Sequence, residues 1–488
     1  MDHSQAPVLD ALVDFRRRGD IAVGPPGHRQ GRGVDPRVLD VLGADLFRDD
    51  VLTLNGLDDR RQSHGIVEQA QELMADAVGA DKAFFSTCGS SLSVKTAMMA
   101  VAGPRDKLLV SRNAHKSVVS GLILSGIQPV WVHPHVDTER HLVHPPEPED
   151  VESALRENPD AKGMLLISPT DWGTCADIAR VQQVCHAADV PLVVDEAWGA
   201  HLPFHDNLPQ WGMNVGADLV VTSVHKMGCA VEQSSVFHLQ GQRVDPTLLK
   251  QRGDILSTTS ASSLVFATLD GWRRQMVEHG ESLLSAALEL ARELRRDIEQ
   301  MRGLHVLERE LIAREASHDL DELQVLMDVT SLGISGYQAA DWLREHERID
   351  IGLSDHGRIL ATISMADDEG TARRLRGALE ALIDAAPDLP RPHPIKLPNP
   401  SEIQLESVDR PRDAFFGPAE HVRVDDAVGR VAAEQITPYP PGIPVVVPGE
   451  RINREVVDYL LSGLEAGMVL PDPADPTLET IRVTAASA

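Results

Sequence analysis

The chain has 488 residues, more than a single hydrophobic core usually supports, so we expect two or more domains. Its 46 Lys and Arg residues stand against 74 Asp and Glu residues, and the resulting net charge of −28 disfavours binding to nucleic acid or to an anionic membrane. The four cysteines form no CxxC pair, no apolar stretch is long enough to span a bilayer, and the first residues lack the apolar core of a signal peptide. We therefore expect a cytoplasmic protein without a disulfide framework.

Residues 1–60 are expected to form an N-terminal arm, because the stretch GPPGHRQG at 24–31 is too rich in turn-forming residues for a regular element. From 61 to 300, short apolar runs alternate with amphipathic helical segments, the first of them at 65–79. The predicted strands lie within residues 83–91, 107–113, 128–134, 163–170, 191–197 and 218–224. This alternation predicts an α/β large domain with a mostly parallel sheet covered by helices on both faces.

A long helix at 281–301 is expected to lead out of the large domain. Residues 301–386 mix strand-like and helical segments, which predicts a smaller α+β domain. The Pro-rich stretch at 387–402 cannot form a helix or a central strand, so we interpret it as a linker. Residues 403–488 are then expected to form a C-terminal domain.

Polar side chains follow the predicted strands at the points where the strands end, and in open α/β sheets ligands bind at these carboxyl ends. Gly89-Ser90-Ser91 follows the first strand, Asp195 ends the fifth, and Lys226 follows the sixth. A Gly-Ser-Ser turn that opens a helix favours a phosphate, a buried carboxylate needs a cation such as a protonated pyridine, and an amine can condense with an aldehyde. Together these residues predict pyridoxal 5′-phosphate as the ligand, although each alone has an ordinary explanation as a cap, an ion pair or a solvated amine.

A histidine-rich loop could suggest a metal centre. It contains His133, His135, His141 and His144 among prolines and acidic residues. The histidines do not have the spacing of a zinc site, so we expect no metal.

Several motifs resemble the ornithine/lysine/arginine decarboxylase family of fold-type-I pyridoxal-phosphate enzymes, in its short form without an N-terminal wing domain. The resemblance covers nearly the whole chain. The segments that carry it are PPGHRQG at 25–31, the stretch at 55–85, DEAWGAH at 195–201, SVHKMGCAVEQSSVFH at 223–238 and PYPPGIPVVVPGE at 438–450. Signatures at opposite ends of the chain make the resemblance specific.

The resemblance implies a pyridoxal-phosphate enzyme that decarboxylates a basic L-amino acid (lysine, ornithine or arginine) to the amine and CO2. It also implies a homodimer or larger homo-oligomer with the active site at the subunit interface. The same cofactor leaves an aminotransferase or another Cα-chemistry enzyme open as an alternative. A non-catalytic regulatory homologue is a further alternative.

By position, the resemblance assigns Lys226 to the Schiff base with the cofactor and Asp195 to the pyridine nitrogen. It places His115 over one face of the cofactor ring and Ala197 under the other. The phosphate contacts that it implies come from Ser90, Ser91, Ser223 and His225 of the same chain and from Thr259 and Ser260 of the neighbouring chain.

Three segments depart from the family pattern, and all three border the expected site. Trp198 stands where the short enzymes have His, TSASS at 259–263 replaces T-S-P-S-Y, and TDWG at 170–173 replaces T-Y-Y-G or similar. We hypothesise that Asp171 receives the distal amine or guanidinium of the substrate, with Trp172 or Trp198 shaping the pocket. A hydrogen bond that only stabilises the turn is the alternative role for Asp171.

Overall fold

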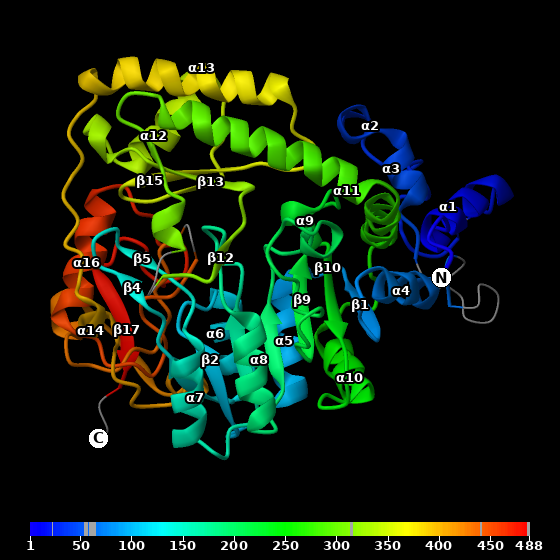
Figure 1. The fold of residues 1–488 in the computed structure, drawn as a ribbon. Coiled ribbons are helices and arrows are strands. Elements are labelled where there is room, and N and C mark those ends of the chain that lie inside the picture. Colours follow the sequence, from blue (N-terminus) through cyan, green and yellow to red (C-terminus); the bar gives the residue numbers. More distant parts are fainter. Residues whose placement is uncertain (22, 53–56, 58–64, 313–315, 440–441, 486–488) are drawn as a thin grey trace. The chain divides into compact units, whose positions relative to one another are not determined.

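The computed structural model describes all residues except 22, 53–56, 58–64, 313–315, 440–441 and 486–488 (Figure 1). Parts of two family-like segments, at 55–56, 58–64 and 440–441, therefore lie outside the described residues. The chain divides into two compact units, each built from two stretches of sequence. The first unit contains residues 1–100 and 193–283, and the second contains residues 101–192 and 284–488.

The first unit contains four strands, β1 (Lys82–Ser86), β8 (Leu192–Asp195), β9 (Leu219–Ser223) and β10 (Ser235–Leu239), in the order β1-β10-β9-β8. The pair β8–β9 is parallel, whereas β10 runs antiparallel to both of its neighbours. The helices are α1 (Pro7–Arg18), α2 (Pro36–Leu42), α3 (Ala44–Asp49), α4 (Ile66–Ala77), α5 (Gly89–Val101), α9 (Val224–Met227), α10 (Pro246–Leu256) and the first part of α11 (Ser263–Glu299). The predictions for β1, β8, β9 and α4 are confirmed.

The N-terminal arm is helical and is joined to α11. Val8, Leu12 and Phe15 are spaced so that they lie on one side of α1, and all three are buried in a core shared with Phe266 of α11. The buried ion pair between Asp270 and Arg273, 2.8 Å long, also holds backbone groups of the arm.

In the second unit, β2 (Lys107–Ser111) lies between β3 (Gln128–Val132) and β6 (Met164–Ile167), and both pairs are parallel. Three of the five strand pairs described among β1, β2, β3, β6, β8, β9 and β10 are therefore parallel, which confirms the predicted mostly parallel α/β sheet. The other elements of this segment are α6 (Lys116–Ser125), β4 (Val136–Asp137), β5 (Leu142–Val143), α7 (Pro148–Glu157), β7 (Thr174–Cys175) and α8 (Ile178–Ala187).

A four-stranded antiparallel sheet, ordered β11-β13-β15-β14, follows α11. Its segment contains β11 (His305–Val306), η3 (Arg309–Leu311), β12 (Asp319–Leu320), β13 (Gln324–Asp328), α12 (Gly336–Trp342), β14 (Leu353–Ser354), β15 (Arg358–Thr362) and α13 (Glu369–Ala385). Helix α13 and the end of α11 lie together beside this sheet (Figure 1), and Arg376 joins them through a 2.7 Å bond to Asp297.

The C-terminal segment has its own hydrophobic core. Its elements are α14 (Pro400–Ile403), α15 (Pro411–Phe416), β16 (Ala419–Arg423), α16 (Arg454–Glu465) and β17 (Thr480–Thr484), and β16 pairs with β17. Val456, Val457 and Leu460 of α16 are fully buried in this core together with Ile481 of β17. Within the described residues, no helix has the length and apolar character needed to cross a membrane.

Candidate active site

Two serine hydroxyls meet at the first turn of α5 in the first unit. Strand pairing sets Ser86, Ser235 and Ser223 side by side on β1, β10 and β9, so the end of β9 lies near the start of α5. The hydroxyl of Ser223 donates to Ser90 Oγ over 2.6 Å. Gly89 begins the helix with φ +73°, and a Cβ there would meet no atom within 4 Å. The open space, the hydroxyls and the helix N-terminus together fit a phosphate group.

Lys226 lies on the single-turn helix α9, directly after β9. It is half-buried, and its Nζ is 4.2 Å from the centroid of the Trp198 ring. The neighbouring His225 is oriented by a 3.0 Å hydrogen bond from Nδ1 to the carbonyl of Ser234. At Gly228 an added Cβ would lie 2.5 Å from the carbonyl oxygen of Val224, so the turn after Lys226 requires glycine.

Asp195 ends β8 and is 5 % exposed. It is in register with Val221 of the adjacent β9, which brings the ends of the two strands together. The N–H of Ala197 donates to Asp195 Oδ1 over 3.2 Å, and the carbonyl of Ala197 accepts from the N–H of Ser223. Asp195, Ala197, Ser223 and Lys226 are thus held by one pair of parallel strands.

Glu196 follows Asp195 and is fully buried, which shifts the pKa of its carboxyl group. Burial raises its pKa well above the ordinary value, against the lowering effect of the Gly212 N–H, and the nearby charge of Asp195 raises it further. Burial therefore favours the protonated form of Glu196.

The turn at Thr259 and Ser260 lies between α10 and α11, and both residues are exposed in the single chain. It is closed locally, because the N–H of Ser260 donates to Thr258 Oγ1 over 3.2 Å. Exposed hydroxyls in this position are accessible to a second subunit.

His115 belongs to the second unit, where it caps α6. Its Nδ1 accepts from the N–H of Ser117 over 3.2 Å. The C-terminal signature contacts it directly, since a Cβ on Gly442 would lie 3.1 Å from Cδ2 of His115. The carbonyl of Gly442 also accepts from the N–H of Lys116 over 3.0 Å. Gly442 of the C-terminal signature therefore contacts the loop after β2. The sequence alone did not reveal this contact.

Asp171 and Trp172 are the central residues of a turn after β6. The N–H of Gly173 donates to the carbonyl of Thr170 over 3.0 Å, and Gly173 has φ +87°. A Cβ on Gly173 would lie 2.7 Å from Gln324 Cβ, so the turn needs glycine for both space and conformation. Asp171 is half-buried and Trp172 is buried.

The side chains of this turn line a pocket of about 210 Å³ in the second unit. Other walls come from the linker and the C-terminal segment, including Ile395, Leu397, Ile403, Pro444 and Val445. Arg358, which is ion-paired with Asp355, lies 5.6 Å from the Trp172 ring. Burial raises the pKa of Tyr459, another wall residue, to about 12, so its hydroxyl stays protonated. The walls thus combine apolar side chains with many polar ones, and polar groups in an apolar pocket fix the orientation of a small-molecule ligand.

Two side chains of the histidine-rich loop, His135 and His144, contact each other and a serine. The rings of His135 and His144 stack with centroids 6.1 Å apart, and His144 Nδ1 is 2.8 Å from Ser317 Oγ. Among the described residues, no group of three or more His, Cys, Asp or Glu side chains could hold a metal ion.

The α/β fold, with a strand-end lysine, a buried strand-end aspartate and a serine-lined helix start that fits a phosphate, matches the class of pyridoxal-phosphate enzymes of fold type I. A family model described as the Orn/Lys/Arg decarboxylase major domain matches residues 6–371, and one for the C-terminal domain of the same family matches residues 400–472. The chain belongs to the Orn/Lys/Arg decarboxylase family.

Curated relatives match along almost the whole chain. It is 38% identical to an arginine decarboxylase of Halalkalibacterium halodurans, over 98% of this chain and 97% of that protein. It is 37% identical to an arginine decarboxylase of Bacillus subtilis, over 99% of this chain and 98% of that protein. A solved structure of the constitutive lysine decarboxylase of Escherichia coli has the same fold, with a TM-score of 0.80 at 19% identity, covering 99% of this chain and 82% of that one.

These findings confirm the expected family, fold class and reaction. The protein is a pyridoxal-phosphate-dependent decarboxylase of basic amino acids.

Proposed function

We propose that the substrate is L-arginine, which is converted to agmatine and CO2. The observation that carries this proposal is the graded similarity to named relatives. Arginine decarboxylases from three species are 37–38% identical and are covered over 97–98% of their length. Lysine decarboxylases are only 22–24% identical and are covered over 75–79% of theirs.

We propose that Lys226, Asp195 and His115 act directly in catalysis. The cofactor supplies a conjugated ring that accepts the electron pair left on Cα when CO2 departs. The amine of Lys226 holds the cofactor aldehyde, and Asp195 keeps the pyridine nitrogen protonated. His115 and Ala197 would both contact the ring of the bound cofactor.

The phosphate cradle is proposed to consist of Ser90, Ser91, Ser223 and His225. The 2.6 Å hydrogen bond between Ser223 and Ser90 supports it, because both hydroxyls stand at the first turn of α5. His225 is oriented by its bond to the Ser234 carbonyl through Nδ1, which leaves Nε2 as its second polar atom.

Asp171 is proposed to bind the guanidinium group of arginine. A planar guanidinium pairs well with a carboxylate, and a half-buried carboxylate strengthens such a pair. The position of Asp171 in a pocket with Trp172, and not on an open surface, supports this role. Trp198, which contacts the Lys226 amine, is also proposed to shape the substrate site.

A homodimer or larger homo-oligomer is proposed as the active form, with Thr259 and Ser260 completing the phosphate site of the neighbouring subunit. Their exposure in the single chain supports this. Four large apolar side chains of the same unit also support an oligomer, because they are 70–82% exposed in the single chain: Ile21, Val23, Val41 and Ile255. A cytoplasmic location is also proposed, because none of the four cysteines forms a disulfide within the described residues.

The substrate assignment is tested with purified protein loaded with the cofactor and offered arginine, lysine and ornithine separately. CO2 and the amine are measured together with any keto acid. We expect kcat/KM for arginine to exceed that for the other two by at least about tenfold, equivalent to about 1.4 kcal/mol in transition-state binding. Equal or better turnover of lysine or ornithine would overturn the arginine proposal, and a keto acid product would indicate transamination.

A further inference from the structure

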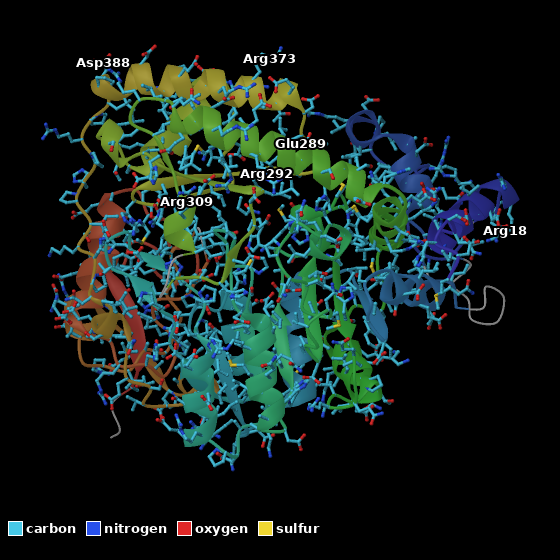
Figure 2. The ribbon with its side chains drawn as sticks, viewed as in Figure 1. Arg18, Glu289, Arg292, Arg309, Arg373 and Asp388 are labelled. Atoms are coloured by element: carbon cyan, nitrogen blue, oxygen red, sulfur yellow. The ribbon has the colours of Figure 1, made fainter. Side chains whose placement is uncertain are left out.

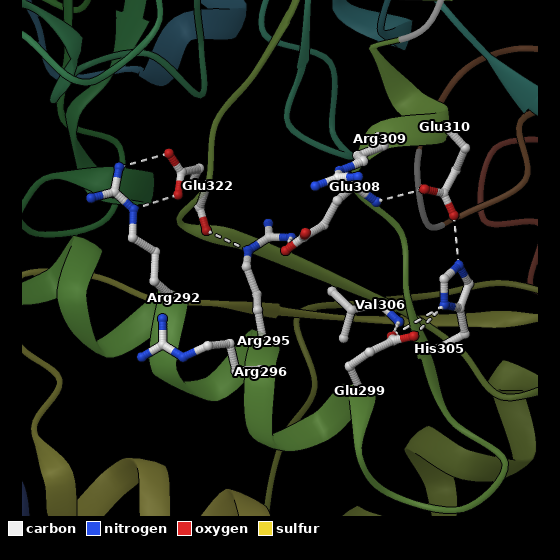
Figure 3. A pocket seen from close by; sticks show the side chains of 10 residues that line it. All are labelled: Arg292, Arg295, Arg296, Glu299, His305, Val306, Glu308, Arg309, Glu310 and Glu322. Atoms are coloured by element: carbon white, nitrogen blue, oxygen red, sulfur yellow. Dashed lines mark hydrogen bonds and ion pairs between the residues drawn. The ribbon is translucent and has the colours of Figure 1, made fainter.

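A second cavity, separate from the Asp171 pocket, lies in the second unit between the end of α11 and the segment after it. Its volume is about 530 Å³, within the range of small-molecule sites. Figure 3 shows that arginines of α11 line it on one side and residues of β11 and η3 line it on the other. Its lining is unusually rich in charge: Arg292, Arg295, Arg296, Glu299, His305, Glu308, Arg309, Glu310 and Glu322.

Two of the four glutamates are matched by arginines of α11. Arg292 binds both carboxylate oxygens of Glu322, at 2.6 and 2.8 Å, and this bond lowers the pKa of Glu322. Arg295, which is 4% exposed, pairs with Glu308 at 3.0 Å and donates to the carbonyl of Gln324. These two cations are therefore committed to partners within the protein.

The other two glutamates share His305. Its Nδ1 is 3.1 Å from Glu299, and its Nε2 is 2.6 Å from Glu310 (Figure 3). Burial lowers the pKa of His305, but the bonds to Glu310 and Glu299 outweigh it and leave the pKa raised. His305 thus keeps a positive charge to higher pH than a free histidine and offsets part of the charge of the two carboxylates.

Two arginines of the cavity remain without a partner. Within the part of the chain that the structure describes, the guanidinium groups of Arg296 and Arg309 form no hydrogen bond or ion pair. Both side chains are exposed, and in Figure 3 they lie on opposite sides of Arg295. These two exposed guanidinium groups are therefore available to contact an anionic ligand.

We propose that this cavity binds a small molecule carrying a diphosphate or triphosphate group, with Arg296 and Arg309 as its two contacts. Guanidinium groups recognise phosphate oxygens through paired N–H donors. Two guanidinium groups in one cavity, drawn on opposite sides of Arg295 in Figure 3, favour a ligand with more than one anionic group. Nucleic acid is disfavoured as the occupant by the overall negative charge.

The test uses the enzyme loaded with its cofactor, so that the phosphate cradle of the active site is already filled. Inorganic pyrophosphate is titrated into it by calorimetry at constant ionic strength. We expect saturable binding of one pyrophosphate per chain, with orthophosphate at least about tenfold weaker because it offers one phosphate group to two arginines. The double variant Arg296→Gln/Arg309→Gln should bind pyrophosphate at least about tenfold more weakly.

Arg373→Gln serves as the matched control. Arg373 is an exposed arginine of α13 (Figure 2) that does not line the cavity, so its loss changes the net charge alone. The control should bind pyrophosphate within twofold of wild type. Thermal unfolding and arginine turnover of each variant establish that the fold is intact, since all three arginines are exposed. Absence of saturable binding by wild type, or equal affinity in the folded double variant, would overturn the proposal.

Discussion

Replacing Arg112 with Met should destabilise the protein through a carboxyl group of the C-terminal signature. Arg112 follows β2 and donates to the carbonyl of Pro444 over 2.7 Å and to that of Val445 over 3.3 Å. It also pairs with Glu450 at 3.1 Å, with both side chains at 10% exposure or less. Burial raises the pKa of Glu450 even with Arg112 beside it. Loss of Arg112 leaves this carboxyl buried and without its cation.

The magnitude follows from the freedom of Glu450 to take up a proton. An exposed Glu titrates near 4.5, and holding it neutral costs about 1.4 kcal/mol per pH unit above that value. At pH 7 the cost is therefore at most about 3.4 kcal/mol. The two lost bonds to Pro444 and Val445 add about 2 kcal/mol. We expect Arg112→Met to lose about 4–5 kcal/mol of unfolding free energy at pH 7.

The pH dependence of the stability loss separates the cost of neutralising Glu450 from the cost of the two lost hydrogen bonds. Burial raises the pKa of Glu450 in the folded state. Its contribution to stability is therefore complete below the pKa of the unfolded state and is lost as the pH rises through the pKa of the folded state. At pH 5 the charge cost in Arg112→Met falls below about 1 kcal/mol. The double variant Arg112→Met/Glu450→Gln should recover about 3 kcal/mol at pH 7 and little at pH 5.

Urea titrations of the wild type, Arg112→Met, Glu450→Gln and the double variant at both pH values provide the measurement. A penalty for Arg112→Met that is the same at pH 5 and pH 7 would refute the reasoning. So would a double variant no more stable than Arg112→Met at pH 7.

The remaining predictions concern the active site. Lys226→Ala should abolish multiple turnover and the visible absorption of the bound cofactor, and turnover near wild type would exclude Lys226 as the cofactor lysine. Asp195→Asn should lower kcat by about a hundredfold or more, measured by CO2 release; a loss below tenfold would remove Asp195 from the ring nitrogen. Asp171→Asn should lower kcat/KM for arginine by about ten- to a hundredfold, whereas a change within twofold would leave Asp171 as a turn residue. Mixing inactive Lys226→Ala chains with an inactive Thr259→Ala/Ser260→Ala variant should restore part of the activity, and no recovery despite proven subunit exchange would argue for a site within one chain.

The sequence determined the helices and strands that have a simple pattern of apolar residues. The apolar runs that became β2, β6, β8 and β9 were evident because buried strands need apolar residues on both faces. The polar residues at the ends of these strands were evident for the opposite reason, since a Lys or Asp next to a core strand is costly without a partner. Family motifs then connected these strand ends with a cofactor.

Strand direction and helix starts needed the tertiary structure. Strand β10 runs antiparallel to β1 and β9, although the apolar pattern of a fully buried strand is the same in either direction. Helix α11 begins at Ser263, well before the segment predicted from sequence, because its first turns pack on the N-terminal arm through Phe266 and Asp270.

Contacts between distant segments were decided only by the folded chain. The C-terminal signature was recognisable as a motif, yet its contacts with Arg112 and His115 join residues more than three hundred positions apart. The unpaired state of Arg296 and Arg309 likewise depends on which carboxylates their neighbours bind. Local sequence sets propensity and pattern, but the partner of a charged side chain is fixed by packing, because desolvation and distance decide which pairs form.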